Sequence, residues 1–159
     1  MENLEVSLVK ADMKDCWQIY EMQVESFKDL LDKYKDYDTN PAAEPLERTE
    51  QRMALDVVDY YFICLDGKKI GVLRVVQLDE DVFRIGMIFI LPEYQGKGYG
   101  KQSILKTEML YPNAKKWELT TIKQEIKLCH FYELMGYETT GEETEIQDDM
   151  AIIGYTKYL

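Results

Sequence analysis

Apolar and polar residues alternate with two different periods in the N-terminal part of the chain. Residues 5–10, EVSLVK, alternate as a short strand does, and Asp12 is a suitable N-cap for a helix. Over residues 13–34, large apolar side chains recur every three or four positions, which predicts one long helix packing this face on the core. The residues on that face are Trp17, Tyr20, Val24, Phe27, Leu31 and Tyr34.

The middle of the chain changes from a polar loop to apolar strands. The stretch DKYKDYDTNPAAEP, residues 32–45, is too polar and too rich in turn formers to continue the helix, and a short helix is predicted over residues 46–57. In residues 60–78 an Asp-Gly pair joins two apolar runs, which predicts a tight hairpin. Residues 82–91, VFRIGMIFIL, are apolar on both faces, as in a central strand.

Helices and strands alternate in the C-terminal half. A helix is predicted to follow residue 100 and to stop near Pro112, and residues 116–122, KWELTTI, predict a strand. The segment EIKLCHFYELM, residues 125–135, predicts a helix with Gly136 as its C-cap. Two strands are predicted after it, at residues 137–144 and 150–157.

The order of these elements is β-α-α-β-β-β-α-β-α-β-β. Hairpins mixed with crossover helices predict an α+β fold with three layers and one mixed sheet. At 159 residues the chain has the size of one domain with one hydrophobic core, and no repeat or linker divides it. We therefore expect a single domain over residues 1–159.

Charge and cysteine content restrict the classes of partner. The chain has 30 acidic and 19 basic residues, a formal net charge of -11, which disfavours nucleic acid and anionic membranes and favours a cationic partner. The alternative is that the acidity only keeps the protein in solution. Cys16, Cys64 and Cys129 form no CxxC pair, so we expect reduced thiols and no metal site. The N-terminus has no signal-peptide pattern, so we expect a cytoplasmic protein.

Three glycines lie within five positions in ILPEYQGKGYG, residues 90–100, between an apolar strand and a helix. Glycines allow backbone N–H groups to converge at a helix N-terminus, which is a favourable place for a phosphate or pyrophosphate. Lys97 and Lys101 add positive charge beside the loop. The alternative is that the glycines only make a tight turn.

Two familiar phosphate-binding motifs can be tested by their spacing. A Walker loop aligned on Gly100 would place its first glycine at Gln95 and its hydroxyl residue at Gln102, so it fails twice. A dinucleotide fingerprint that starts at Gly98 ends on Ser103 and is a weak match. A nucleotide-binding domain therefore remains a minor alternative.

The loop resembles the acetyl-coenzyme A signature of the GCN5-related N-acetyltransferase (GNAT) family, with Pro92, Gln95, Gly98 and Gly100 in the signature positions. Downstream, FYELMGY, residues 131–137, is similar to the family's common FYEKLGF. The resemblance covers essentially the whole chain. It implies a mostly antiparallel sheet of about seven strands flanked by about four helices, and transfer of an acetyl group from acetyl-CoA to a primary amine.

The resemblance also assigns residues. Family members grip the coenzyme A pyrophosphate with loop amides and the pantetheine arm with the end of the preceding strand, while splaying of the fourth and fifth strands opens the slot. The corresponding residues here are Phe89, Ile90, Leu91, Gln95, Gly96, Lys97, Gly98, Tyr99, Gly100 and Lys101. Tyr132 matches the tyrosine that protonates the departing thiolate, an uphill transfer of about 2 kcal/mol for ordinary pKa values. Its alternative role is core packing.

Two positions depart from the family pattern. Glu125 stands where many members have an asparagine that bonds the coenzyme arm, so that role is not carried over. No carboxylate lies in RIGMIFIL, residues 84–91, where many members have a general base. Glu118, Glu125, the acidic loop or a water chain are the open alternatives for the base, and His130 is expected on the surface or in a structural role.

The resemblance places the amine acceptor near the first helix and the loop after it, residues 27–44, and near the turn between the last two strands, about residues 144–149. Phe27, Tyr34, Tyr37 and Asp38 are the candidate acceptor residues, and acids interleaved with aromatics suit a cationic amine such as a polyamine or a lysine side chain. The alternative is a solvated loop. A non-catalytic acyl-CoA-binding module of the same fold is the second functional hypothesis, and a homodimer is an open possibility because dimers are common in the family.

Overall fold

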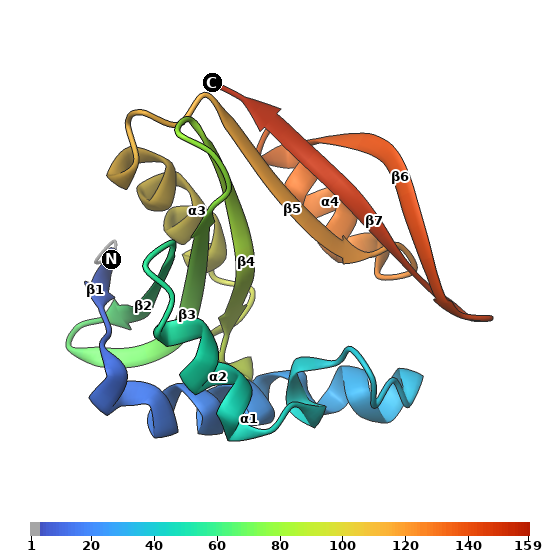
Figure 1. The fold of residues 1–159 in the computed structure, drawn as a ribbon, viewed down its shortest axis with the longest axis horizontal. Coiled ribbons are helices and arrows are strands. Elements are labelled where there is room, and N and C mark those ends of the chain that lie inside the picture. The colour runs from blue at the N-terminus through green and yellow to red at the C-terminus, as the bar shows by residue number, and fades with distance from the viewer. Residues whose placement is uncertain (1–3) are drawn as a thin grey trace.

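The computed structural model describes residues 4–159, which form a twisted seven-stranded sheet between two layers of helices (Figure 1). The strands are β1 Val6–Lys10, β2 Val58–Leu65, β3 Lys68–Gln77, β4 Val82–Ile90, β5 Lys116–Ile122, β6 Glu138–Gln147 and β7 Met150–Tyr158. The helices are α1 Cys16–Tyr34, α2 Leu46–Met53, α3 Tyr99–Leu110 and α4 Ile126–Leu134. Short 3-10 turns lie at Met13–Asp15, Pro41–Ala43 and Pro92–Tyr94.

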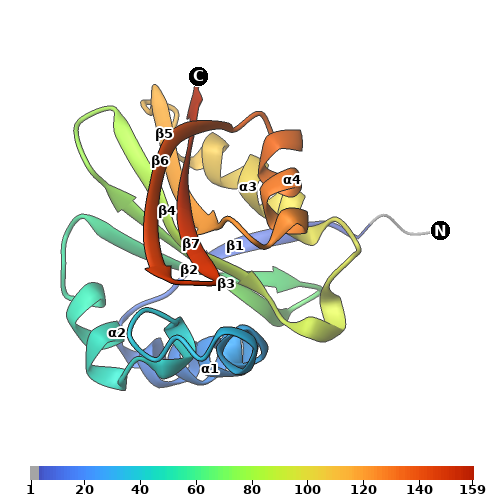
Figure 2. The same ribbon diagram turned by 90° about the vertical axis from the view of Figure 1, so that its right-hand side faces the viewer.

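The predicted fold class and order of elements are confirmed. The strand order is β1-β2-β3-β4-β5-β7-β6, and every neighbouring pair is antiparallel except β4 and β5. Helices α1 and α2 cover one face of the sheet, and α3 and α4 cover the other (Figure 2). No helix of residues 4–159 is long and apolar enough to cross a bilayer.

Local signals in the sequence begin several of these elements as predicted, although α2 ends at Met53 and not near residue 57. The Asp12 carboxylate accepts a hydrogen bond from the amide of Lys14, and the Asp15 carboxylate accepts one from the amide of Asp12, so a capping box opens the first helical segment. Asp66 and Gly67 both have positive φ, as a tight hairpin between β2 and β3 requires.

The prediction that Trp17 packs in the core is wrong. Trp17 is 57% exposed and lies against Tyr20 on the outer surface of α1, with ring centroids 5.7 Å apart. The buried stripe is displaced around the helix and consists of Cys16, Ile19, Met22, Gln23 and Tyr34. Both stripes have helical spacing, so periodicity alone does not choose between them, and the tertiary contact with the sheet decides.

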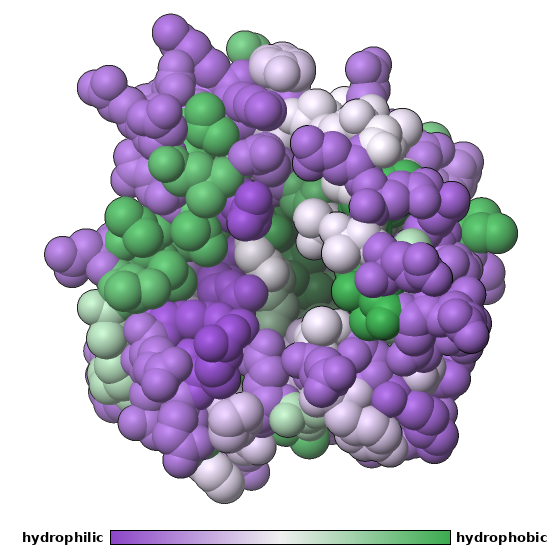
Figure 3. All heavy atoms as spheres, turned by 45° about the vertical axis from the view of Figure 1, so that its right-hand side comes forward, coloured by the Kyte–Doolittle hydropathy of each residue, from purple (hydrophilic) through white to green (hydrophobic). Residues whose placement is uncertain are grey.

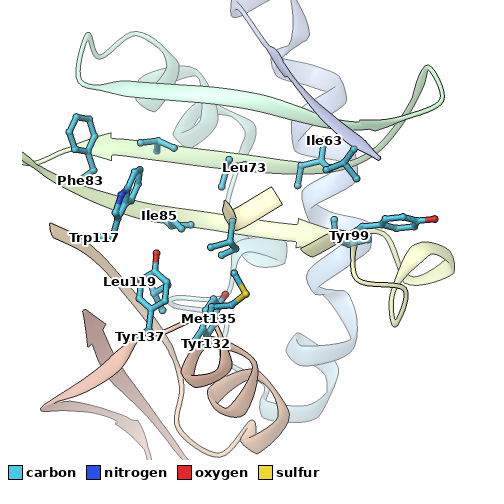
Figure 4. Close-up of a cluster of buried hydrophobic side chains, with 14 of the residues drawn as sticks. Ile63, Leu73, Phe83, Ile85, Tyr99, Trp117, Leu119, Tyr132, Met135 and Tyr137 are labelled. Atoms are coloured by element: carbon cyan, nitrogen blue, oxygen red, sulfur yellow. The ribbon is translucent and has the colours of Figure 1, made fainter. Parts of the chain in front are cut away.

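Two hydrophobic clusters hold the layers together. On one face, Ile19 and Met22 of α1 pack on alternate residues of β2, β3 and β4. On the other face, Ile104 of α3 and Tyr132 of α4 belong to one cluster with the fully buried Trp117 of β5. Figure 4 shows Trp117 beside Phe83, with Tyr132, Met135 and Tyr137 lying together further along the cluster.

Strands β4 and β5 separate after three residue pairs. Only Val82–Arg84 of β4 pairs with Lys116–Glu118 of β5, and the two strands then diverge (Figure 1). Each keeps its ladder with its outer neighbour, β3 for β4 and β7 for β5. The edge of β4 that faces β5 therefore carries backbone polar groups that no strand pairs, and these are open to a ligand. The splayed strands expected from the resemblance are present.

Candidate active site

A cavity of about 910 Å³ opens where β4 and β5 separate. Its wall is built from α1, the loop after it, β3, β4, the glycine loop, β5 and α4, which brings together segments from most of the chain. Figure 3 shows a hollow on one face of the molecule, with apolar and weakly polar residues inside and hydrophilic residues around it. A long ligand with one polar end and one extended arm fits such a shape.

The glycine loop forms one end of the cavity. Gly96 and Gly98 have φ of 77° and 85°, and Gly98 is the N-cap of α3. Within residues 4–159, no backbone or side-chain acceptor takes a hydrogen bond from the amides of residues 96–101. These free amides stand at a helix N-terminus beside Lys101, which lines the cavity, so the arrangement suits a phosphate group.

The structure brings most of the expected coenzyme-binding residues to this cavity. Those that line it are Phe89, Ile90, Gln95, Gly96, Gly98, Tyr99, Gly100 and Lys101. Leu91 packs in the α1 cluster instead, and Lys97 is exposed. The Gln95 side chain donates to the carbonyl of Ile90 at 2.7 Å, which ties the loop to the end of β4.

Tyr132 of α4 lies on the same cavity, at its buried wall. The residue is 8% exposed and packs against Phe131, Tyr137 and Tyr155. Burial, with a smaller contribution from Cys129, raises the pKa of Tyr132 to about 12. Full proton transfer to a thiolate would then be uphill by about 5 kcal/mol, compared with about 2 for an ordinary tyrosine. Tyr132 is thus a neutral hydrogen-bond donor over the whole physiological range.

The four candidate acceptor residues do not lie together. Phe27 lines the cavity and meets Phe89 edge-on, with ring centroids 5.7 Å apart. Tyr34 is buried beside the N-terminus of α4, where its hydroxyl donates to Glu125. Tyr37 is 64% exposed, and Asp38 is also exposed, so neither lines the cavity.

A charged cluster that was not predicted from the sequence also lines the cavity. Glu44 accepts two hydrogen bonds from Arg52, at 2.6 and 3.0 Å, and Arg74 of β3 lies nearby on the same wall. Gln23, fully buried on α1, donates to the same carboxylate at 3.4 Å. The sequence contains one sign of this cluster, which is Arg74 in the otherwise apolar strand IGVLRVV. Arginine is rarely buried in such a strand unless it has a partner.

The structure argues against most of the carboxylates considered as the general base. Glu118 does not line the cavity, and Glu125 is held by Lys33 at 2.6 Å and Tyr34 at 2.5 Å. In the acidic loop, Asp36 lines the cavity but accepts hydrogen bonds from the amide and hydroxyl of Thr39. His130 is exposed on α4, which agrees with a surface position.

Glu125 stabilises the fold instead. Its carboxylate accepts hydrogen bonds from Lys33 and Tyr34, and so links the end of α1 to the start of α4. Partial burial acts to raise the pKa of Glu125, but hydrogen bonds from Lys33 and Tyr34 outweigh burial and lower it. We expect Glu125→Gln to reduce the free energy of unfolding by about 1 kcal/mol at pH 7, because a charge-assisted bond becomes a neutral one. Urea denaturation measures this difference.

The pH dependence follows from the sign of the shift. A carboxyl group whose pKa is lower in the folded state contributes stability above its unfolded value of about 4.3, and that contribution is lost as the pH falls through the folded value. The difference between wild type and Glu125→Gln should therefore shrink below about pH 4. Glu138→Gln, at an exposed site on β6, is the control. Equal stability of wild type and Glu125→Gln at pH 7 contradicts the prediction.

The split sheet, the glycine loop at the head of α3 and the buried tyrosine on the opposite wall together define an acetyltransferase fold. The chain belongs to the acetyltransferase (GNAT) family, whose sequence profile matches residues 16–137. No curated protein is matched.

Solved structures with the same fold cover nearly the whole chain. An acetyltransferase from Thermus thermophilus is 13% identical, with a TM-score of 0.77 and 100% of both chains covered. A GNAT family acetyltransferase from Elizabethkingia anophelis, solved with acetyl-CoA bound, is 16% identical, with a TM-score of 0.66 and 100% of both chains covered. A chimera of the spermidine N-acetyltransferase SpeG from Vibrio cholerae and hSSAT is 17% identical, with a TM-score of 0.74 and coverage of 97% and 95%. At these identities the likeness shows the fold.

Proposed function

We propose that the protein is an acetyl-CoA-dependent N-acetyltransferase, in which a primary amine of a small molecule or peptide attacks the thioester directly. The observation that carries this proposal is that one cavity joins the free amides of the glycine loop, the unpaired edge of β4 and the hydroxyl-bearing wall at Tyr132. A donor with a pyrophosphate at one end and a thioester at the other matches that order of groups.

The residues present fit acetyl-CoA as the donor. Free amides of residues 96–101 and the charge of Lys101 favour a pyrophosphate at the head of α3. Leu91 donates its amide to Ile70 of β3, and by alternation Phe89 also turns its backbone toward β3. The backbone groups of Ile88 and Ile90 therefore face the open edge of β4, where the amides of an extended pantetheine arm could add. The fold neighbour solved with acetyl-CoA bound supports the same assignment.

In the proposed reaction one side chain, that of Tyr132, acts on the reacting groups. The neutral amine nitrogen bonds to the carbonyl carbon of the thioester and then loses its extra proton to water in the cavity. The carbon–sulfur bond breaks while the Tyr132 hydroxyl donates a hydrogen bond to the departing thiolate, and water protonates that thiolate to give free coenzyme A. An alkylammonium must first lose a proton, which costs about 4.6 kcal/mol at pH 7. Since Asp36 and Glu44 already accept hydrogen bonds from protein groups, we assign that proton to water in the cavity.

Release of free coenzyme A thiol across a panel of amines tests the proposal. We expect acetyl-CoA to raise the melting temperature where ATP and NAD do not, and at least one class of amine to raise thiol release above background hydrolysis. Stabilisation by acetyl-CoA with no release for any amine would instead support the non-catalytic acyl-CoA-binding module. The absence of a carboxylate from β4 favours that second candidate.

A further inference from the structure

Arg74 is a half-buried cation with few partners. It lies on β3, on the face covered by α1 and α2, and lines the cavity. Its guanidinium donates to the carbonyl of Gly86 at 2.9 Å and to the hydroxyl of Tyr60 at 3.4 Å, and it forms no salt bridge with any residue from 4 to 159. A guanidinium has five N–H donors, so most of its hydrogen-bonding capacity is unused.

The backbone of β4 is shaped around this side chain. The pairing of β3 with β4 slips next to Arg74, so that Met87 is opposite Arg74, Ile85 is opposite Val75, and Gly86 is the extra residue of a β-bulge. A Cβ on Gly86 would lie 2.8 Å from Nε of Arg74. Glycine therefore allows the guanidinium to lie close to the β4 backbone, at the wall of the cavity.

The charges around Arg74 do not balance. Arg52 lies close enough to oppose the charge of Arg74, and Glu44, whose carboxylate also acts on Arg74, already accepts two hydrogen bonds from Arg52. Asp36, the other carboxylate on the cavity, is 3% exposed and bonded to Thr39 of its own loop. Burial lowers the pKa of Arg74, as expected for a cation short of counter-charge. Two guanidiniums thus share one carboxylate.

We infer that the acceptor is an amine that also carries a carboxylate, and that Arg74 binds this carboxylate at the end of the cavity remote from the glycine loop. The inference rests on the proposed function, because it names the substrate class of the same site. A half-buried guanidinium without an ion-pair partner is costly, and a planar carboxylate could pair with it by two parallel hydrogen bonds.

Two other acceptor chemistries fit the cluster less well. A polyamine would bring further positive charge toward Arg52 and Arg74, while Glu44 and Asp36 are both engaged. Glu44, Arg52 and Arg74 together carry a net charge of +1. A monoanionic carboxylate neutralises this charge, whereas a phosphate dianion would leave an excess of negative charge.

Matched acceptor pairs test the inference. We expect α-amino acids or peptides with a free carboxylate to exceed their carboxamides at least tenfold in kcat/KM, and to exceed spermidine and phosphoethanolamine. In Arg74→Gln the ratio of acid to amide should fall to about one, while the dissociation constant of acetyl-CoA stays within twofold, which shows that the fold is retained. Arg84→Gln, at an exposed site on the same sheet, should keep the wild-type ratio.

A binding measurement separates this inference from the proposed function. Calorimetry with N-acetyl amino acids and their carboxamides needs no turnover, and we expect the acids to bind wild type at least tenfold more tightly, with the preference lost in Arg74→Gln. Thiol release without a preference for acids would overturn the inference and leave the proposed function standing. Preferential binding of acids without any thiol release would overturn the proposed function and leave the anion-binding role of Arg74 standing. Equal binding of acids and amides overturns the inference.

Discussion

Replacing Tyr132 with phenylalanine should lower kcat roughly 100-fold and leave the dissociation constant of acetyl-CoA nearly unchanged. Loss of one preorganised hydrogen bond to charge that develops in the transition state typically costs about that much. Tyr132 is held rigidly among Phe131, Tyr137 and Tyr155, so phenylalanine fills the same space and removes only the hydroxyl. Steady-state kinetics with thiol detection and calorimetry with acetyl-CoA measure the two quantities.

Tyr137→Phe is the matched control for this substitution. Tyr137 belongs to the same aromatic cluster and is 1% exposed, but its hydroxyl donates to Glu108 at 3.2 Å and it does not line the cavity. The Tyr137→Phe variant should have a lower free energy of unfolding than wild type and the same kcat. Because burial raises the pKa of Tyr132 to about 12, wild-type kcat should show no decline from tyrosine ionisation up to about pH 10. An unchanged kcat in Tyr132→Phe would remove Tyr132 from the mechanism.

Replacing Gly98 with alanine is expected to weaken acetyl-CoA binding roughly tenfold. Gly98 has a φ of 85°, a left-handed conformation that costs a residue with a Cβ about 1–2 kcal/mol. No atom of residues 4–159 lies within 4 Å of the added methyl group, so the effect comes from the backbone angle and not from a clash. Relaxation of that angle would turn the free amides at the head of α3 away from their shared ligand.

Gly141→Ala separates the effect on binding from the effect on stability. Gly141 has a φ of 81° and lies in β6, away from the cavity. A Cβ on Gly141 would also meet no atom of the described residues within 4 Å. Both variants should lose similar stability in urea denaturation, and only Gly98→Ala should weaken acetyl-CoA binding measured by calorimetry. Equal affinities in the two variants would contradict a role for the loop in binding the donor.

The glycine loop at the cavity and the elements beside it could be predicted from the sequence, because their signals are local. The glycines of residues 96–100 set backbone angles within a few positions, and the strand before them and the helix after them follow from short periodic patterns. The element order was predictable for the same reason. The prediction failed for Trp17, where two helical stripes were equally periodic and only packing on the sheet distinguishes them.

The acceptor side could not be predicted in the same way. The acidic residues of the loop at 36–44 suggested a cationic partner. In the structure, Glu44 accepts hydrogen bonds from Arg52, and Asp36 accepts them from Thr39. Arg74 comes from a different strand, and it has no ion-pair partner among residues 4–159 because of how these segments meet. Pairing between distant side chains leaves no periodic signal in a single sequence.

Local signals in the chain were enough to establish the fold class, the order of strands and helices and the position of the glycine loop, since capping residues, turn residues and hydrophobic periods act over a few neighbouring positions. The assembled fold was needed to establish which face of α1 is buried, where β4 separates from β5 and which charges at the cavity remain uncompensated. Those properties depend on contacts between segments far apart in the chain, where the balance of burial and charge is set by tertiary packing.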